Sequence, residues 1–527
     1  MQTLTTAEPI APGAAEGGPG FPGILYPGPA PDEAAEDPDF FHDLHLDAVL
    51  TAVTSGREAF RLEPFLRARC PDTDCVAYRQ AVFRDLEDEP TASAIRSFAA
   101  GMVETRESLN RLRKGHYFYE QRWWLLVAAR AYCRAVRALR DELSALPLRS
   151  MALLGLRDML HGYAASPALT ALERDAEDAA AGLAEVRYRL RIAGPKITVG
   201  RVEAGAPDYG AEVLATFDRF RQGAGREYRF KFTDAPELNH VEAAVADRVA
   251  RLFPAEFARL AAFADRHGSF IDPGVEQFDR EAQFYLAYFE HMAKAGRAGG
   301  GFCYPEVAAG GDVIRAEDTF DLALATLLAR SGGRIVTNDI ELHPPERMVV
   351  VTGPNQGGKT TFARTVGQLM HLAALGVPVP GTRVSLPLVD RIHTLFEREE
   401  AVEDLVSKLE DDLRRMRAIL AELTDRSAVV MNETFSSTTV ADQSFINRRV
   451  LEAIGAVGAW CVIVTFLDEL AALTPATVSM VSTVDSAEPA RRTFRILRQP
   501  ADGLAYAMTI AEKHELTYDQ VVARARR

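Results

Sequence analysis

The chain has 527 residues, of which 47% are hydrophobic and 25% charged, a composition typical of globular proteins with several domains. Its formal net charge of −14 excludes a surface that is basic throughout, but a local basic patch stays compatible because salt screens charges beyond about 8 Å. The sequence has no apolar run of about 18 residues and no basic segment leading into an apolar one at its start, so we expect a cytoplasmic protein without a membrane partner. Its five scattered cysteines predict reduced thiols and no structural zinc.

The first 38 residues are rich in proline and glycine and poor in large apolar side chains. Such a composition cannot bury enough surface to offset the entropy lost on ordering, so we predict a disordered leader over residues 1–38. Residues 39–315 follow, and their apolar positions recur every three to four residues over most of the length. This spacing predicts a helical core or lever domain.

Within the helical domain, a short stretch with strand-like alternation interrupts two long predicted helices. The first helix spans about Ala168 to Glu185, and the second contains Pro254, which predicts a kink. Between them, residues 187–232 form a predicted β tip in which ten Lys and Arg outnumber five acids, and aromatic residues are interleaved with the basic ones.

The alternation in this tip lets one strand face carry several basic side chains toward a row of phosphates. A half-buried sheet with a solvated outer face explains the same pattern, and both interpretations stay open. On the first interpretation, the candidate contacts to double-stranded DNA are Arg187, Arg189, Arg191, Lys196, Arg229 and Lys231.

Residues 316–527 alternate apolar strands with amphipathic helices, which predicts a largely parallel sheet covered by helices on both faces. After the strand "ERMVVVTG" the sequence satisfies G-x-x-x-x-G-K-[ST], and a helix begins at Lys359. In this pattern the glycines let backbone N–H groups converge on phosphates, the lysine reaches the β- and γ-phosphates, and the hydroxyl that follows ligates Mg²⁺. We therefore predict a P-loop ATPase domain of the ABC type that binds ATP and Mg²⁺ through Gly353, Pro354, Asn355, Gln356, Gly357, Gly358, Lys359, Thr360 and Thr361.

A second apolar strand leads into Asn432 and Glu433, the position of the second acidic element of such ATPases. Glu433 is suited to orient or deprotonate the attacking water, and with Lys359 it makes up the predicted catalytic pair. Asn432 joins Thr360 as a predicted metal-side residue, but an amide brings no negative charge. We expect weaker retention of the metal and unimpaired nucleotide binding.

Five segments, in this order, resemble the ATPase domain of the MutS DNA mismatch repair family: "VTGPNQGGKTTFARTVGQ", "LVDRIHTLFEREE", "NETFSSTTVADQ", "VIVTFLDELAAL" and "RRTFRILRQPADGLAYAMTIAEKHEL". The resemblance is strong over 335–527, and the helical region is similar in layout only. It implies a homodimer that sandwiches nucleotide, with 436–438 near the partner subunit, and a helical lever whose clamp-like tip binds DNA. It also implies that Ile335 rests on adenine and that Ser407 reaches the γ-phosphate, although Ser407 is equally explained as a helix cap.

The sequence departs from the family pattern at several places. Phe466 stands where the family has a switch histidine, Ile335 stands where an aromatic residue is common, and "KLEDDL" replaces a Gly/Ser-rich signature. The N-terminal mismatch-reading domain and its wedge motif are missing from the sequence as given. The expected function is therefore a slow MutS-like ATPase in DNA repair or recombination whose preferred DNA structure stays open. The alternatives are a non-hydrolysing nucleotide-binding adaptor dimer and an ATPase with a protein or RNA partner.

Overall fold

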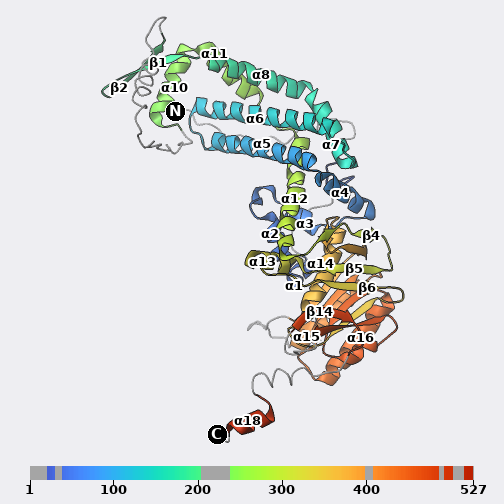
Figure 1. Cartoon of the computed structure of the whole chain (residues 1–527). Coiled ribbons are helices and arrows are strands. Elements are labelled where there is room, and N and C mark those ends of the chain that lie inside the picture. The colour runs from blue at the N-terminus through green and yellow to red at the C-terminus, as the bar shows by residue number, and fades with distance from the viewer. Residues whose placement is uncertain are drawn as a thin grey trace, which may run out of the picture. The chain divides into compact units, whose positions relative to one another are not determined.

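The computed structural model describes residues 21–29, 38–202, 238–397, 408–485, 492–501 and 516–525. The chain divides into two compact units, and each is described by itself (Figure 1). The first unit contains residues 1–85, 149–156 and 280–527, and the second contains 86–148 and 157–279. The predicted division at 315/316 is therefore not where the chain separates, because the first helices pack with the C-terminal domain.

The first unit is built on a six-stranded sheet in the order β10-β11-β12-β7-β13-β14, in which only β14 is antiparallel to its neighbour. Its strands are β7 (Met348–Thr352), β10 (Ile392–Phe396), β11 (Ala428–Asn432), β12 (Trp460–Val464), β13 (Thr477–Val484) and β14 (Arg492–Arg498). The central strands are apolar without interruption because helices cover both faces of the sheet. Met348 and Val350 of β7 pack with α15 (Lys408–Glu422) and α16 (Val440–Val457), while α14 (Lys359–Ala374) contacts β7, β11 and β12.

A smaller sheet in the order β4-β9-β5-β6 belongs to the same unit, and a two-stranded pair joins β3 to β8. These elements and α13 come before or between the main strands: β3 (Phe302–Cys303), β4 (Glu306–Ala308), β5 (Ile314–Thr319), α13 (Leu322–Ser331), β6 (Asn338–Leu342), β8 (Val379–Pro380) and β9 (Arg383–Pro387). Two 3₁₀ turns, η2 (Gly296–Ala298) and η3 (Asp468–Ala472), and the C-terminal α18 (Tyr518–Ala525) complete this part of the unit.

Helix α14 ties the N-terminal helices to the C-terminal domain. Gln368 donates to Leu44 O at 2.8 Å, His371 Nε2 contacts Leu66 O at 2.9 Å, and Gly367 lies against Leu44. The N-terminal elements concerned are α1 (Phe40–Asp43), α2 (Leu46–Thr54), η1 (Glu58–Phe60), α3 (Glu63–Arg67) and α4 (Thr73–Leu86). Periodicity predicts these helices but does not reveal which domain their apolar faces cover.

The expectation of disorder for the leader does not hold for residues 21–29, which we call the N-terminal strap. Ile24, Leu25 and Tyr26 are buried, with exposures of 1%, 0% and 4%. Their burial supplies about 1.5–3 kcal/mol for each large side chain, and flanking prolines reduce the entropy of the undocked segment. A run of three apolar residues between prolines is therefore enough to order a segment whose average composition indicates disorder.

The strap's backbone is held by side chains of α4 and of α12 (Pro273–Ala295). The amides of Ile24 and Leu25 both donate to Glu281, and Tyr285 Oη donates to Ile24 O at 2.6 Å. Arg79, fully buried, donates to Leu25 O at 2.9 Å and places its guanidinium 4.5 Å from the centre of the Tyr26 ring. The strap thus supplies partners for a buried carboxylate and a buried guanidinium.

The second unit is a helical layer that ends in a hairpin. In Figure 1, α5 (Glu89–Lys114) and α6 (Phe118–Ala145) run side by side, and α6 also contacts α8 (Pro167–Ala184) and α11 (Pro254–Arg266). At Gly101 of α5 a Cβ would lie 2.6 Å from Ala135 Cβ, so the absence of a side chain there permits the close approach of α5 and α6. The unit also contains the hairpin β1 (Tyr188–Ala193) and β2 (Lys196–Arg201), α10 (His240–Leu252) and the part of α7 (Met151–Ala164) from Arg157 onward.

The two long helices predicted around the tip are present. Ser166 caps α8 by accepting from Leu169 N, and the second helix divides at Phe253 into α10 and α11, where Pro254 predicts a kink. Asp175 on α8 binds His267 at 2.9 Å and Arg266 at 2.6 Å, which ties α8 to the end of α11. No helix in the described ranges is both long and apolar enough to span a membrane.

Truncating the strap tests its structural role. Removing residues 1–29 takes the strap carbonyl from buried Arg79, which keeps Leu375 O, and the two strap amides from Glu281. A lost hydrogen bond to a charged group typically costs about 1.5–3 kcal/mol. We expect a lower melting temperature than that of the full chain, and partial recovery when a synthetic peptide of residues 21–29 is added in excess. Removal of residues 1–20 alone is the control, since it leaves the strap intact. Equal melting temperatures for the two truncations would contradict the role of the strap.

Candidate nucleotide site

The loop between β7 and α14 has the backbone that its glycines permit. Gly353 and Gly358 have φ values of 109° and 90°, in the region that favours glycine. At Gly357 the limit is space, because a Cβ there would lie 2.1 Å from Ser482 Oγ, and that hydroxyl donates to Gly357 O at 2.8 Å. Ser482 of β13 therefore buttresses the loop, a role that no local motif reveals.

Lys359 is held inside this loop. Its side chain is 4% exposed, and Nζ donates to Gly353 O at 2.8 Å and to Pro354 O at 3.0 Å. Burial lowers the pKa of Lys359 to about 8, although the Glu433 carboxylate opposes the shift. Two carbonyls of the loop thus already accept hydrogen bonds from the ammonium.

Phe466 lies over the same ammonium. Lys359 Nζ is 4.4 Å from the centre of the Phe466 ring, a cation–π distance. The sequence indicates only that Phe466 stands in place of the histidine of the family pattern. In the structure the ring contacts the cation and offers no hydrogen bond in return.

Thr360 and Asn432, the two predicted metal-side residues, contact each other directly. Thr360 Oγ1 donates to Asn432 Oδ1 at 2.8 Å, from the first turn of α14 to the end of β11. A hydroxyl and an amide oxygen are donors that Mg²⁺ accepts, so the pair fits the predicted ion in kind. Both groups are neutral, and they compensate less of the ion's charge than a carboxylate does.

Glu433 follows Asn432 with φ = 50°, which is unusual for a residue with a side chain. Its amide donates to Val464 O at 2.9 Å, and its side chain lines the cavity that contains Lys359. The next residue, Thr434, is buried and donates to Asn447 Oδ1 of α16 at 2.8 Å. The neighbouring helix thus maintains the strained turn that presents Glu433, and nothing in the motif identifies Thr434 or Asn447 as its support.

A cavity of about 480 Å³ extends from the phosphate loop to an apolar wall. Ile335 lines this wall where the resemblance places the base, together with Leu328 and Phe494. Phe494 comes from β14 with φ = 58°, and its carbonyl accepts from Asn338 Nδ2 at 3.1 Å. No sequence pattern predicts that this aromatic residue lines the same wall as Ile335, because the two residues lie far apart in the chain. The volume and the mixed apolar and loop lining suit a nucleotide.

The hairpin of the second unit carries the other predicted site. Arg189 and Arg191 lie on one face of β1, and Lys196 of β2 lies on the same face by the strand register. All six residues of β1 are exposed, whereas Val199 and Gly200 of β2 are half-buried, and the rest of the predicted tip lies outside the described ranges. Arg187 precedes the strand, and its guanidinium donates to Ala184 O at 2.7 Å, at the end of α8, so it does not continue the predicted row.

Several predicted residues lie outside the described ranges: Ser407, Arg229 and Lys231. Of the predicted partner-facing loop, Ser436 is exposed and donates to Glu397 Oε1 at 3.2 Å. The roles of all these residues stay predictions.

Residues 349–527 match the family model of MutS domain V. This C-terminal part of the chain carries a domain of the MutS family. The chain is 30% identical over 203 residues to the endonuclease MutS2 of Gemmatimonas aurantiaca, which is 38% of this chain and 24% of that protein. It is 38% identical over 151 residues to the DNA mismatch repair protein MutS of Zymomonas mobilis, covering 28% and 17%.

A longer match, at 25% identity over 327 residues, is to the DNA mismatch repair protein MutS of Chlorobium phaeobacteroides and covers 61% of this chain and 35% of that protein. The matched part is thus well under two thirds of each relative. The glycine loop, Asn432 and Glu433 fall within the part that matches MutS domain V, and Ile335 lies shortly before it.

The pKa of Lys359 makes nucleotide binding depend on pH. A bound phosphate favours the ammonium and restores its pKa toward the ordinary 10.5, so binding takes up a proton between about pH 8 and 10.5. We expect affinity for a non-hydrolysable ATP analogue to be highest below pH 8 and to fall about tenfold per pH unit within that window. Lys359→Arg keeps its charge and flattens the profile, which calorimetry on both proteins measures. Parallel profiles would contradict the assignment.

Proposed function

We propose that the chain is an ATP-binding, slowly hydrolysing MutS-type ATPase that works as a homodimer. In this proposal the nucleotide state controls a helical lever and clamp that close on double-stranded DNA in repair or recombination. The observation that carries the proposal is that Lys359, Thr360 and Glu433 line one cavity at the carboxyl ends of β7 and β11, where Thr360 also donates to Asn432.

In hydrolysis, Lys359 leaves the carbonyls of Gly353 and Pro354 and neutralises charge on the β- and γ-phosphates of ATP. The loop amides and the start of α14 stabilise the same oxygens, and Glu433 orients the attacking water or accepts its proton. Mg²⁺, which Thr360 and Asn432 would hold, supplies further neutralisation of the phosphates when it is bound. Each step uses a side chain that the fold already places at the cavity.

Two residues support slow turnover. Asn432 contributes no negative charge on the metal side, and Phe466 contacts Lys359 without offering a hydrogen-bond donor to the γ-phosphate. Each change removes part of the electrostatic stabilisation on which phosphoryl transfer depends. The same two residues favour the second candidate, a nucleotide-binding adaptor dimer that does not hydrolyse ATP.

DNA as the partner is supported by the printed names of the relatives and by the charge of the hairpin. Two of the relatives are DNA mismatch repair proteins. The face with Arg189, Arg191 and Lys196 is basic within a chain of net charge −14, and exposed Tyr188, Leu190 and Ile192 alternate with the two arginines. Such a face suits contact with the phosphate backbone and shows no base-specific readout.

Hydrolysis separates the two candidates. Glu433→Ala removes the group that handles the attacking water, and we expect steady-state phosphate release to fall about 10²-fold or more. Asn432→Asp restores a carboxylate on the metal side, so it should lower the Mg²⁺ concentration needed for half-maximal rate. Ser444→Ala on α16, outside the cavity, is the control. A wild-type rate equal to that of Glu433→Ala would leave the adaptor dimer as the function.

Salt dependence tests the DNA contact. Each phosphate contact contributes about 0.9 to the slope of log K against log salt, so the Arg189→Ala/Arg191→Ala variant should lose about 1.8 from the slope. Binding of duplex, mismatched and branched DNA is measured between about 50 and 200 mM salt, with and without ATP. A variant lacking Arg113 and Arg130, two exposed arginines of α5 and α6, controls for net charge. Equal slopes for the two variants would count against the hairpin.

A further inference from the structure

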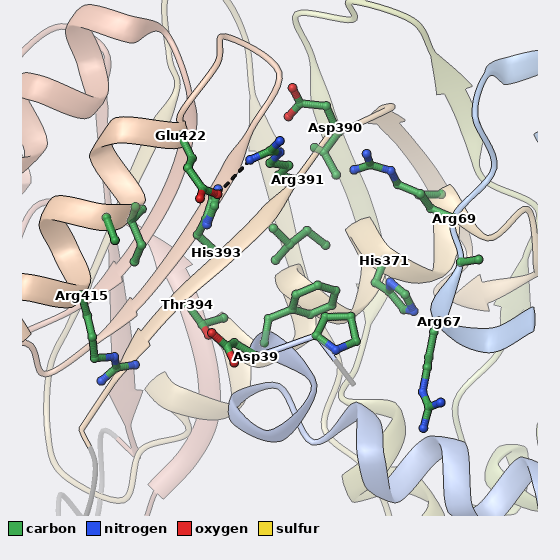
Figure 2. Close-up of a pocket in the computed structure, with 18 residues that line it drawn as sticks. Asp39, Arg67, Arg69, His371, Asp390, Arg391, His393, Thr394, Arg415 and Glu422 are labelled. Carbon is green, nitrogen blue, oxygen red and sulfur yellow. Dashed lines mark hydrogen bonds and ion pairs between the residues drawn. The ribbon is translucent and has the colours of Figure 1, made fainter. Parts of the chain in front are cut away.

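The first unit contains a second cavity, of about 590 Å³, that shares no lining residue with the nucleotide site (Figure 2). Its walls are edge strand β10 and the loop before it, the later turns of α15, the end of α14, and residues 38–40 and 67–69. The nucleotide site lies at the carboxyl ends of the strands, whereas this cavity begins at Val389, ahead of β10. The two cavities are therefore separate sites on one domain.

The lining is rich in cations. Arg67, Arg69, Arg391 and Arg415 face it, against Asp39, Asp390 and Glu422. Arg391 pairs with Glu422 at 2.8 Å, and Asp390 accepts from the hydroxyls of Thr424 and Ser427. Two of the three carboxylates thus already have partners.

Arg69 differs from the other arginines of the lining. Its guanidinium donates no hydrogen bond within the described ranges, and Figure 2 shows it extending into the cavity on the side of Asp390 and Arg391. Burial lowers the pKa of Arg69, and the nearby Arg391 and Arg426 lower it further while Asp390 opposes them. An anion in the cavity would relieve this crowding of positive charge.

His393 carries a second unmet requirement. Its Nε2 is buried and has no hydrogen-bond partner in the part of the chain that the structure describes. Buried polar atoms are nearly always hydrogen-bonded, so this atom of a residue that lines the cavity has an unmet hydrogen-bonding requirement. The ring lies beside the Arg391–Glu422 pair on the same wall as α15 (Figure 2).

Apolar side chains also line the cavity. They are Phe40, Val389, Ile392 and Ile419, and the Phe40 ring stands edge-on to His371 with 5.5 Å between centres. Burial lowers the pKa of His371 to about 4, so this ring is neutral near pH 7. The same cavity thus offers a flat ring system apolar side chains to contact, in addition to the arginines.

We propose that this cavity binds a small phosphorylated molecule with a planar ring, the chemistry of a mononucleotide. Arg69 receives the phosphate, the apolar part around Phe40 and Ile392 receives the ring, and the buried Nε2 of His393 gains a partner from the ligand. The volume exceeds what an isolated phosphate fills and lies in the range of sites for small organic ligands.

The test uses the full chain carrying Lys359→Ala, which weakens the first site, and measures binding by calorimetry. The probes are adenosine and guanosine 5′-monophosphate, with adenosine and inorganic pyrophosphate as the ring-only and anion-only arms. We expect at least one monophosphate to bind more tightly than both partial probes. Arg69→Ala should weaken that binding about tenfold or more, since it removes a charge-assisted contact. Arg448→Ala, an exposed arginine of α16 outside the cavity, should leave it unchanged.

His393→Phe separates binding from folding. It removes a buried atom without a partner, so the melting temperature should stay equal or rise while monophosphate affinity falls. Three results would overturn the proposal: no monophosphate binds, pyrophosphate binds as tightly as the monophosphates, or Arg69→Ala and Arg448→Ala behave alike. The first result would mean that the cavity holds solvent only. None of these readouts depends on ATP hydrolysis, so failure here is distinguishable from failure of the proposed ATPase.

Discussion

The burial of α14 is the constraint on which the first unit depends. Thirteen of its sixteen residues are buried, including the polar side chains of Lys359, Thr365, Gln368 and His371. Buried polar groups must be hydrogen-bonded, and Gln368 and His371 find their partners in the N-terminal segment and in Asp321. The first residue of α14 therefore belongs to the phosphate loop, and the later turns of the same helix bind the N-terminal segment. The N-terminal helices belong to the first unit for this reason.

The local parts of the nucleotide site follow from the sequence, because each depends on residues close together in the chain. The strand, the glycine loop and Lys359 form one motif, and the parallel register of β7, β12 and β11 brings Asn432 beside Thr360. Once a parallel sheet is predicted, the meeting of these two residues at its carboxyl edge is nearly fixed.

The parts that sequence reasoning misses depend on contacts between distant segments. Phe494 joins Ile335 because β14 folds beside β6, and Phe466 covers Lys359 because β12 lies next to β7. The strap is missed for another reason. The average composition of the first 38 residues gives no weight to three adjacent apolar residues, whose backbone binds the buried carboxylate of Glu281 and the buried guanidinium of Arg79. For Arg187 the alternation predicts too much, because it assigns this residue to a strand that begins one residue later, at Tyr188.

Helix α12 gives the strap a significance beyond stability. This helix starts in the second unit and continues into the first, and its residue Glu281 accepts both strap amides just inside the first unit. The carboxylate of Glu281 and the hydroxyl of Tyr285 bind the strap to α12, while Arg79 links the strap to Leu375 O, directly beyond α14. Through these side chains the strap is joined both to the helix that continues into the unit with the basic hairpin and to the helix that begins at the phosphate loop.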